Sequence, residues 1–451
     1  MTRRAIVGIQ FGDEGKAKII GSILTYRDRF FGNYGPVTVA RHQGGGNAGH
    51  TQYVTLDSGD ESVVFHLIPS GTFFPGTYNL IIPETVIEPI FLVEELESVG
   101  KKITSKGCQI SPENFGISGR VQMTLGYHLE IEANEVRKRG GRIAPTLRGI
   151  MPTYMDMAAR RGITFAEFLN AASFSSLLDE NLERASWDLA EIYNMAGSDG
   201  VVLPDTQMRR RVKIDKDALM AKYERAREVL GPFHISDRKA MALLDTGNVL
   251  FEGAQGVGID RDYGRRPDNT SSCPVRLPRN ADKIGVAKSF ISRVGADDPP
   301  TRLPPDIEEL IRGNRGEEGA EFGSTTGRPR SMGWPDIPVT RYGAEMAGVD
   351  SIAVTHFDKL PRVPGRLKIC DYYLIDGERV DEPPADQTQW KRIEPHCIEV
   401  DGFPGEDFSH ARDLSDLSTR ARDYLSLIQD LVGKPISMVS VGPRNEQTIF
   451  V

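Results

Sequence analysis

Short apolar runs alternate with helical patterns along most of the chain. Runs rich in valine, isoleucine and leucine that end at glycine or polar residues indicate strands. Strands that alternate with helices favour a mostly parallel β-sheet covered by helices, and such short apolar runs suit buried strands. The expected strands are Ala5–Val7, Pro36–Ala40, Val63–Phe65, Asn79–Ile82, Val249–Phe251, Ser351–Thr355 and Ile436–Ser440.

Apolar residues at helical spacing predict three long helices. These extend over Phe165–Met195, Lys213–Leu230 and Ser415–Leu431, and the last two are amphipathic. The stretch Asp297–Pro329 is rich in proline and glycine, so we expect a long loop there, and loops of such length are often functional. The sequence shows no internal repeat and no linker that would divide the chain.

Charge and cysteine content narrow the range of partners. The formal net charge is −8, which argues against nucleic acid as a partner because polyanions bind basic surfaces. The four cysteines, Cys108, Cys273, Cys370 and Cys397, are far apart and indicate reduced thiols in a cytoplasmic protein. No apolar segment approaches the roughly 20 residues of a membrane span, so we expect no membrane partner.

The first expected strand leads into a glycine-rich turn, Gly8–Lys16, and Ala17–Leu24 then has helical spacing. Free backbone N–H groups at a helix N-terminus attract phosphate, and the lysine of the turn adds positive charge. The turn is not a Walker A loop, because Ala17 stands where Ser or Thr would bind magnesium. Asp13 and Glu14 bring negative charge to the same place. Either magnesium offsets this charge, or Asp13 takes a proton from a substrate.

Polar groups also follow later strands, at the edge where α/β sheets bind ligands. A second glycine-rich segment, Gln43–Thr51, contains Asn47 and His50, and a histidine can exchange a proton near neutral pH. Gln255 offers a neutral amide to a base carbonyl. Asp358 can accept both the ring N–H and the exocyclic amine of guanine, a pair that adenine does not supply.

Together these motifs resemble adenylosuccinate synthetases, in the same order and over nearly the whole chain. The resemblance implies one large α/β domain, residues 1–451, with a central mostly parallel sheet and features of P-loop GTPases. It also implies a GTP- and magnesium-dependent ligase that joins L-aspartate to IMP through 6-phosphoryl-IMP, giving adenylosuccinate, GDP and phosphate. The matching motifs are Gly12–Lys16, Gly44–Thr51, His66–Gly71, Phe251–Gly256, Thr270–Ser272, Gly323–Arg330, Gly333–Trp334 and Ser440–Pro443.

The resemblance assigns a role to each residue at the reacting centre. Asp13 would be the base that removes the purine N1 proton, His50 the acid that assists transfer of the γ-phosphate, and Gln255 the amide that orients the purine. Asp13 and the backbone carbonyl of Gly49 would bind Mg²⁺. Because the family works as a homodimer, Arg160 would reach the active site of the other subunit.

The resemblance also assigns the residues that contact each substrate. GTP would contact Gly12, Asp13, Glu14, Gly15, Lys16, Ala17, Lys18, Gly49, His50, Thr51, Arg330, His356, Phe357, Asp358, Ser440, Val441 and Gly442. IMP would contact Asp13, Lys16, Asn47, Ala48, Gly49, His50, Thr146, Arg160, Gln255, Thr270, Val294 and Arg328. L-Aspartate would contact Ser324, Thr325, Thr326, Gly327 and Arg328.

The chain departs from the family pattern inside these sites. His356 replaces the lysine of the guanine-binding motif, and Ala17 replaces a glycine. Three segments around the monophosphate also differ, namely Ala144–Leu147, Gly264–Pro267 and Cys273–Pro274. A paralogous ligase therefore stays open as an alternative. It would use another 6-oxopurine monophosphate such as GMP or dGMP, another triphosphate such as ATP or dATP, or another amino donor.

A third alternative belongs to a different class of protein. A GTP-binding regulatory module without ligase activity would keep the nucleotide pocket. It would have no need for the base and the acid that Asp13 and His50 supply, and these two residues therefore favour an enzyme.

Overall fold

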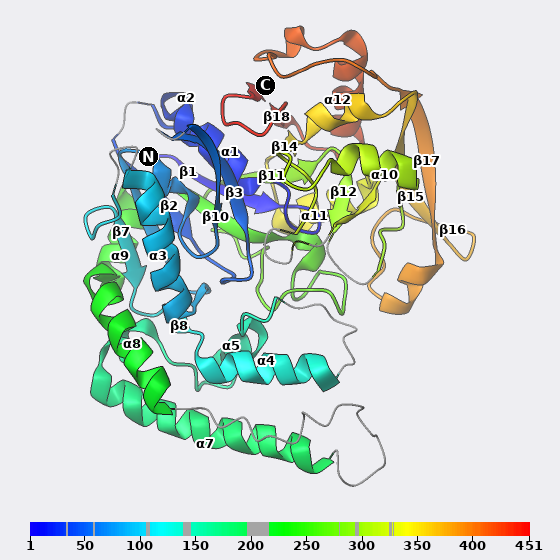
Figure 1. Cartoon of the computed structure of the whole chain (residues 1–451). Helices are drawn as coiled ribbons and strands as arrows, with labels where there is room; N and C mark the ends of the chain where they lie inside the picture. The colour runs from blue at the N-terminus through cyan, green and yellow to red at the C-terminus, as the bar shows by residue number, and fades with distance from the viewer. Residues whose placement is uncertain are drawn as a thin grey trace.

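A central sheet of ten strands runs through the molecule (Figure 1). The computed structural model describes residues 1–32, 35–56, 59–104, 109–138, 146–195, 216–278, 280–293, 297–323, 327 and 329–451. The strands of the central sheet are β1 (Arg3–Gly8), β2 (Val37–Arg41), β5 (Thr77–Ile81), β7 (Phe115–Ser118), β9 (His234–Ile235), β10 (Asn248–Gly256), β11 (Asp282–Lys288), β14 (Ser351–Thr355), β18 (Ile436–Ser440) and β19 (Thr448–Phe450).

The sheet is mostly parallel, as the sequence predicts. Its order is β19-β18-β14-β11-β1-β10-β2-β5-β7-β9, and every neighbouring pair is parallel except β18 with β19. β1 lies inside the sheet, between β10 and β11. The loops after these strands therefore open at one edge of the sheet, where α/β proteins bind ligands.

Helices cover both faces of the sheet, which confirms the predicted fold class. Successive residues of a strand point to opposite faces. Ile6 of β1 packs against α1 (Lys16–Thr25) through Ile19 and Ile23. Val7, the next residue, belongs to the hydrophobic cluster on the other face, with α11 (Ile337–Ala347) and α12 (Thr419–Val432).

A second group of helices lies beyond the sheet, at the bottom of Figure 1. It consists of α4 (Gly126–Lys138), α5 (Ile150–Ala158), α6 (Phe165–Leu169), α7 (Ala171–Met195) and α8 (Lys216–Leu230). The remaining α-helices are α2 (Arg27–Phe31), α3 (Pro89–Thr104), α9 (Asp237–Thr246) and α10 (Pro305–Arg312). No helix in the described ranges is long and apolar enough to cross a membrane.

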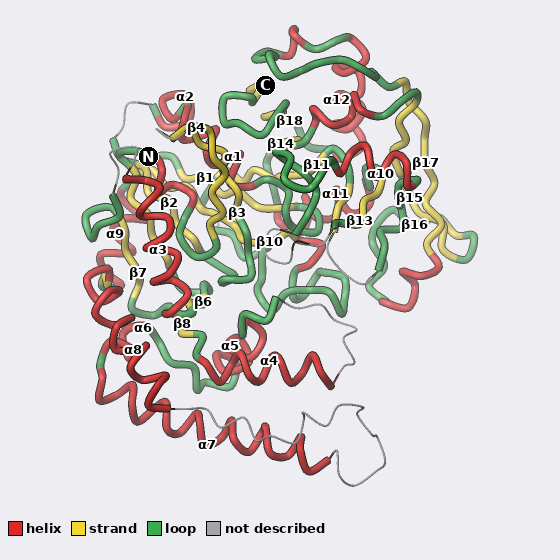
Figure 2. Tube along the Cα trace, viewed as in Figure 1, coloured by secondary structure: helices red, strands yellow, loops and turns green. Residues whose placement is uncertain are grey.

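Small antiparallel sheets flank the central one. Strands β15 (Arg366–Ile375), β16 (Glu378–Val380) and β17 (Ile393–Asp401) form a three-stranded sheet, whose long β15 and β17 stand out in Figure 2. Two-stranded pairs are formed by β3 (His50–Leu56) with β4 (Gly59–Phe65) and by β12 (Ile291–Arg293) with β13 (Ser331–Gly333). A further parallel pair is formed by β6 (Val86–Ile87) with β8 (Gln122–Met123).

The strand predicted at Val63–Phe65 exists but lies outside the central sheet. It belongs to β4 and pairs with β3 in a hairpin. Val63 and Phe65 are buried in a core cluster, whereas Val64 between them is half-buried. The strand therefore buries only one of its two faces. Because all three of its residues are apolar, the sequence alone does not distinguish it from a central strand that is buried on both faces.

Two of the predicted helices and the predicted loop also need correction. Phe165–Met195 is two helices, because Asn170 has an extended backbone and its side-chain oxygen accepts the N–H of Ser173. The helix predicted from Ser415 begins at Thr419, capped by Ser418. The predicted loop at Asp297–Pro329 contains α10, whose Ile307 and Ile311 are buried. Residues 213–215 of the helix predicted at Lys213–Leu230 lie outside the described residues.

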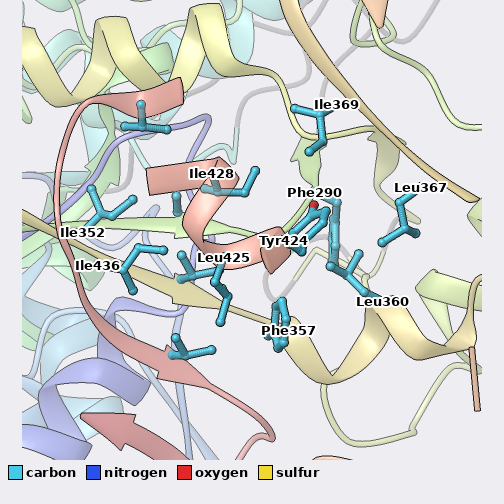
Figure 3. Close-up of a cluster of buried hydrophobic side chains, with 14 of the residues drawn as sticks. Phe290, Ile352, Phe357, Leu360, Leu367, Ile369, Tyr424, Leu425, Ile428 and Ile436 are labelled. Carbon is cyan, nitrogen blue, oxygen red and sulfur yellow. The ribbon is translucent and has the colours of Figure 1, made fainter. Parts of the chain in front are cut away.

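The hydrophobic core next to the expected guanine end of the site is large. Figure 3 shows α12 contributing Tyr424, Leu425 and Ile428 to a cluster that also contains Phe357. Each fully buried side chain of this size contributes about 1.5–3 kcal/mol. Because Phe357 immediately precedes Asp358, packing of its ring fixes the turn that presents Asp358.

Cys273, Cys370 and Cys397 are free thiols, and Cys108 lies outside the described residues.

Gly343 of α11 permits a close approach to the loop after β1. An alanine Cβ there would lie 2.1 Å from the carbonyl oxygen of Ile9, a backbone atom that cannot easily move. Gly343→Ala should therefore lower the free energy of unfolding by about 1–3 kcal/mol. Gly100 inside α3 has open space at that position, so Gly100→Ala should raise stability by about 0.5–1 kcal/mol. Denaturant unfolding measures both, and equal effects of the two substitutions would contradict the close packing.

Candidate active site

The turn between β1 and α1 has the strained backbone of a ligand-binding loop. Gly12 and Gly15 have φ values of 90° and 87°, and the non-glycine residue Asp13 has a φ of 58°. Gly256, at the end of β10, lies against this turn, because a Cβ there would lie 2.6 Å from the N atom of Gly12. The turn and the end of β10 are therefore packed backbone to backbone, which brings Asp13 near Gln255.

Glu14 is the internal anchor of this turn. Its carboxylate is fully buried and accepts hydrogen bonds from the N–H groups of Gly12 at 2.7 Å and Gln10 at 3.2 Å. Its other oxygen lies 2.7 Å from Lys16 Nζ, which is also buried. Two backbone donors and a cation compensate the free-energy cost of burying this carboxylate. The turn is therefore pre-formed around it.

A pocket of about 270 Å³ opens beside the turn. Thirteen of the residues assigned to GTP line it. These are Asp13, Gly15, Lys16, Ala17, Lys18, Gly49, His50, Thr51, Arg330, His356, Asp358, Ser440 and Gly442. Gly12, Glu14, Phe357 and Val441 support the pocket from behind without lining it. Residues from both ends of the sequence therefore converge on one concave site, as a nucleotide would require.

Asp13, whose side chain is 35% exposed, ends a chain of ion pairs whose other members, Arg330, Glu321 and Lys288, are buried. Arg330 Nη2 lies 2.7 Å from Asp13 Oδ2, and Arg330 Nη1 lies 2.9 Å from Glu321 Oε2. Lys288 Nζ lies 2.7 Å from the same Glu321 oxygen. Burial favours the neutral form of Asp13, but the charges of Arg330, Lys288 and Lys16 outweigh it and hold the pKa of Asp13 below its usual value. The carboxylate is therefore ionised at neutral pH and can accept a proton.

Sequence reasoning missed two members of this chain, Lys288 and Glu321. Lys288 is the last residue of β11. Gln255 and Asp358 are selected from the sequence because they also stand at or just after the end of a strand. The expected strands do not include β11, so the sequence does not mark Lys288 as a residue at a strand end. Glu321 precedes the Gly323–Arg330 motif by two residues, and only its contacts in the structure distinguish it from a surface acid.

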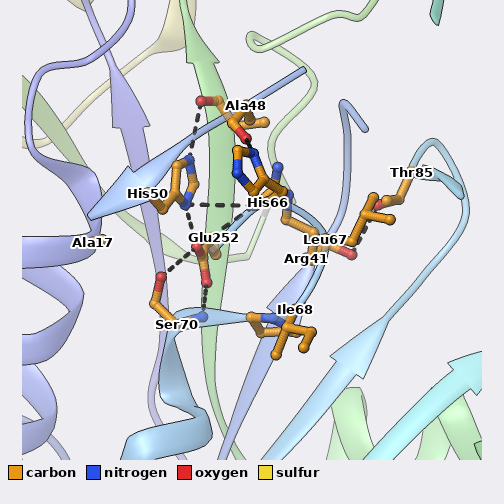
Figure 4. Close-up of polar contacts among 12 residues, drawn as sticks. Ala17, Arg41, Ala48, His50, His66, Leu67, Ile68, Ser70, Thr85 and Glu252 are labelled. Carbon is orange, nitrogen blue, oxygen red and sulfur yellow. Dashed lines mark hydrogen bonds and ion pairs between the residues drawn. The ribbon is translucent and has the colours of Figure 1, made fainter. Parts of the chain in front are cut away.

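His50 is held by a buried carboxylate, Glu252, as Figure 4 shows. His50 Nδ1 donates to Glu252 Oε1 in a very short contact, and Nε2 faces the Ala254 carbonyl oxygen at 3.2 Å. Glu252 also accepts from the N–H of Ser70 at 2.8 Å and from its hydroxyl at 2.7 Å. Burial would raise the pKa of Glu252, but hydrogen bonding to His50 and the charges of His50 and Arg41 lower it to about 2.

The protonation of His50 follows from this arrangement. Glu252 holds the proton of Nδ1, so Nε2 is the nitrogen left to gain or lose a proton, and because the Ala254 carbonyl oxygen can only accept, Nε2 bonds to it only when the ring carries both protons. Burial lowers the pKa of His50, and the positive charge of Arg41 lowers it further, while the hydrogen bond that His50 donates to Glu252 raises it. A triphosphate next to the ring would add negative charge and so raise this pKa, which would make His50 an acid when nucleotide is bound.

Three residues assigned to IMP or catalysis meet at the end of β10. Gln255 Nε2 donates to Asn47 Oδ1 at 3.2 Å, and the Ser272 hydroxyl donates to Gln255 Oε1 at 2.8 Å. Thr270 Oγ1 lies 3.3 Å from the Ser272 hydroxyl. Ala48 is buried nearby, and its carbonyl accepts from His66 Nδ1 at 2.6 Å. The amide of Gln255 is thus fixed from both of its ends.

The other residues assigned to IMP and aspartate are less well defined. Thr146 is half-buried at the start of the turn that leads to α5, and Arg160 is exposed after α5 with a φ of 62°. Gly327, with a φ of 63°, donates its N–H to Gly323. Val294, Ser324, Thr325, Thr326 and Arg328 lie outside the described residues.

The expected guanine end of the pocket carries a neutral imidazole. His356 has a φ of 56°, lies 3.7 Å from Glu321 Oε1 and packs edge-on against Phe290. Burial holds the pKa of His356 well below its usual value despite Glu321, so the ring is uncharged at neutral pH. Burial also raises the pKa of Asp358.

Lys18, which lines the pocket, is held by residues near the C-terminal strand. Lys18 Nζ donates to the carbonyl oxygen of Gln447 at 2.9 Å and also contacts the hydroxyl of Thr448 in β19. Burial lowers the pKa of Lys18 to about 7. Negative charge from a bound phosphate would raise it again, so this lysine is suited to respond to nucleotide.

Known proteins match the chain from end to end. A family model for adenylosuccinate synthetase matches residues 5–449. The adenylosuccinate synthetase of Pelotomaculum thermopropionicum is 35% identical over 464 residues, covering 100% of this chain and 99% of that protein. That of Streptococcus gordonii is 36% identical over 462 residues, covering 99% and 98%. The solved structure of fully ligated adenylosuccinate synthetase from Plasmodium falciparum aligns with a TM-score of 0.83 at 26% identity and covers 100% of both chains.

The fold, the glycine-rich turn after β1 and these matches define the class: a nucleotide-dependent carbon–nitrogen ligase with a large α/β fold. The chain belongs to the adenylosuccinate synthetase family. The resemblance in the sequence is thereby confirmed, while the roles of individual residues stay predictions that the geometry supports.

Glu252 yields a prediction about stability and pH. Glu252→Gln should lower the free energy of unfolding at pH 7 by about 1–3 kcal/mol, because buried donors lose a charged acceptor. Since the folded pKa is about 2 and the unfolded value about 4.5, this contribution is complete above pH 4.5 and is lost as pH falls towards 2. Denaturant titrations from pH 7 to pH 3 should show the deficit shrinking below pH 4.5. Exposed Glu378→Gln is the control, and a deficit independent of pH would count against the ionised pair.

Proposed function

We propose that the protein joins L-aspartate to IMP with GTP as the phosphate donor, giving adenylosuccinate, GDP and phosphate. One observation carries the proposal. Asp13 and His50 both line the nucleotide pocket, and both lie next to the end of β10, where Gln255 and Asn47 meet. A base and an acid therefore face two substrates at once, a phosphate donor on one side and a purine on the other.

The proposed chemistry has two steps. Asp13, ionised by its cationic neighbours, takes the N1 proton of the purine, and O6 then attacks the γ-phosphorus while His50 donates a proton to the charge that develops. This forms 6-phosphoryl-IMP and GDP. The amine of aspartate then attacks C6, and phosphate leaves. A positioned acid or base of this kind contributes on the order of 10²–10⁴ in rate.

The proposed metal is Mg²⁺, held by the carboxylate of Asp13 and the carbonyl of Gly49. Both residues line the pocket, and both offer oxygen atoms, the ligand type that magnesium prefers. Bound there, the ion would neutralise part of the charge of the triphosphate. Lys16 and Arg330 already place two further cations at the same end of the pocket.

The remaining assignments complete the proposal. Asp358 would accept the ring N–H and the exocyclic amine of guanine, with Ser440 and Gly442 beside it. The segment Ser324–Arg328 would bind aspartate, since hydroxyls and a guanidinium suit carboxylates. Residues 1–451 would form one domain of a homodimer, and the exposed Arg160 would contact the monophosphate of the partner's site.

The test is a panel of substrates with product analysis. The chain is incubated with Mg²⁺ and L-aspartate, with GTP, ATP or dATP against IMP, GMP or dGMP, and products are identified by chromatography and mass spectrometry. We expect adenylosuccinate from GTP and IMP. Equal or greater turnover of a guanine monophosphate would overturn the choice of IMP. Hydrolysis that requires neither aspartate nor a monophosphate would instead indicate a regulatory module.

Asp13→Asn is the matched variant for this panel. Turnover should fall on the order of 10²–10⁴, because the amide cannot take the purine proton. Binding of GDP in the absence of Mg²⁺ should remain close to that of the unmodified chain, since the amide keeps the size of the side chain. A surviving rate would show that Asp13 is not the base.

The shared site makes its own prediction. Arg160→Leu should raise the KM for the monophosphate, because a phosphate loses a cationic partner. When Arg160→Leu and Asp13→Asn chains are mixed and allowed to exchange subunits, each mixed dimer regains one intact site if Arg160 acts across the interface. Activity should then rise above that of either variant. No rise, despite mixed dimers confirmed by native mass spectrometry, would place Arg160 in its own subunit's site or outside both.

A further inference from the structure

One face of the β3–β4 hairpin forms a wall of the nucleotide pocket. Thr51 and Tyr53 line the pocket from β3, and their cross-strand partners Val64 and Ser62 line it from β4. Their neighbours along each strand, Val54 after Tyr53 and Val63 between Ser62 and Val64, point the other way and are buried in a hydrophobic cluster. This alternation is the two-residue period of a strand, and it aims the Tyr53 side chain at the space for the nucleotide.

A second segment, Asn314–Phe322, covers the same pocket, and we call it the strap. Its residues Glu318, Gly319, Ala320, Glu321 and Phe322 line the pocket. The strap is joined to the guanine side by ion pairs, from Glu317 to Arg362 at 3.1 Å and from Glu318 to Arg444 at 3.6 Å. Each exposed ion pair of this kind contributes little free energy, so these two pairs alone do not fix the position of the strap.

Gly319 is the point at which the strap is held from both sides. Its N–H donates to the Tyr53 hydroxyl at 2.7 Å, and its carbonyl oxygen accepts from Lys359 Nζ. Gly319 has a φ of 71°, a conformation that lets both of its peptide groups reach their partners. Tyr53 thus links the hairpin to the strap across the mouth of the pocket.

The strap also leads to the catalytic end of the pocket. Glu321, two residues after Gly319, accepts from Lys288 and Arg330, and Arg330 contacts Asp13. The backbone N–H of Arg330 also donates to the Glu321 carbonyl at 3.1 Å. A strap that is fixed at Gly319 therefore keeps Glu321, and through it Arg330, in place beside Asp13.

We propose that Tyr53 is a nucleotide-positioning residue of this protein. Its ring forms part of the wall around a nucleoside di- or triphosphate, and its hydroxyl latches the strap over that ligand. The inference deepens the proposed function, because it assigns a further residue to the same pocket, but it requires only that the pocket binds a nucleotide. Loss of the hydroxyl alone should leave the wall intact and release the latch.

The test compares two tyrosines that differ in this contact. Tyr53→Phe removes the latch, whereas Tyr424→Phe removes a buried hydroxyl with no hydrogen-bond partner among the described residues. Binding of Mg²⁺–GDP is measured by calorimetry, and KM and kcat by the aspartate-dependent reaction. We expect Tyr53→Phe to raise both the Kd for GDP and the KM for GTP about three- to tenfold, the size of one hydrogen bond, with unfolding midpoints unchanged. Tyr53→Ala should weaken binding further, because it removes the wall as well.

The outcomes separate this inference from the proposed function. Nucleotide affinities of Tyr53→Phe equal to those of Tyr424→Phe would overturn the latch. If the unmodified chain makes no adenylosuccinate but Tyr53→Phe still weakens GDP binding relative to the control, the latch stands and the proposed reaction fails. A rise in KM together with a fall in the unfolding midpoint would mean that Tyr53 only stabilises the fold, which also overturns the inference.

Discussion

The site depends on a buried carboxylate that does not itself line the pocket. Glu14 closes the turn between β1 and α1 on itself, with two backbone N–H groups on one side and Lys16 on the other. Without it, a buried turn with glycines in left-handed conformations would lose conformational order, and the donors it satisfies would be buried unpaired. Glu14 thus frees its neighbour Asp13 to point outward with an accessible carboxylate. Two adjacent acids therefore lie in different environments: Glu14 is buried inside the turn, and Asp13 lines the pocket.

Other acids in the site are also paired with cations. Asp13, Glu252 and Glu321 are three acids in a largely buried region, and each has cationic partners from distant parts of the chain. A buried ion pair is a weak source of stability, because desolvation cancels much of the attraction. The main effect of these ion pairs is to decide which side chains carry a proton. They keep Asp13 ionised and hold the proton of His50 on Nδ1. His356 is neutral at the expected guanine end because burial outweighs the charge of Glu321.

The sequence predicts those parts of the molecule that are local. The apolar run Ser351–Thr355 and the glycine-rich turn Gly8–Lys16 show their structure through neighbours a few residues away, and both lie where they were expected. The break at Asn170 and the hairpin position of Val63–Phe65 are decided by capping and by which side is buried, which a short pattern does not reveal. Lys288 and Glu321 are recognised only through contacts with residues far away in the sequence. The ordered set of motifs identified the family because it samples the whole chain, whereas any single motif samples one loop.

The contact of Lys18 with Gln447 and Thr448 has a consequence for folding during synthesis of the chain. The partners of Lys18, Gln447 and Thr448, lie 429 and 430 residues later in the chain. β1 also pairs with β10 and β11, which are made much later. A polypeptide still attached to the ribosome would therefore have no finished nucleotide site, and its glycine-rich segment would stay exposed until the C-terminal residues emerge. Binding of nucleotide would then mark the completed protein and favour it over the unfinished one.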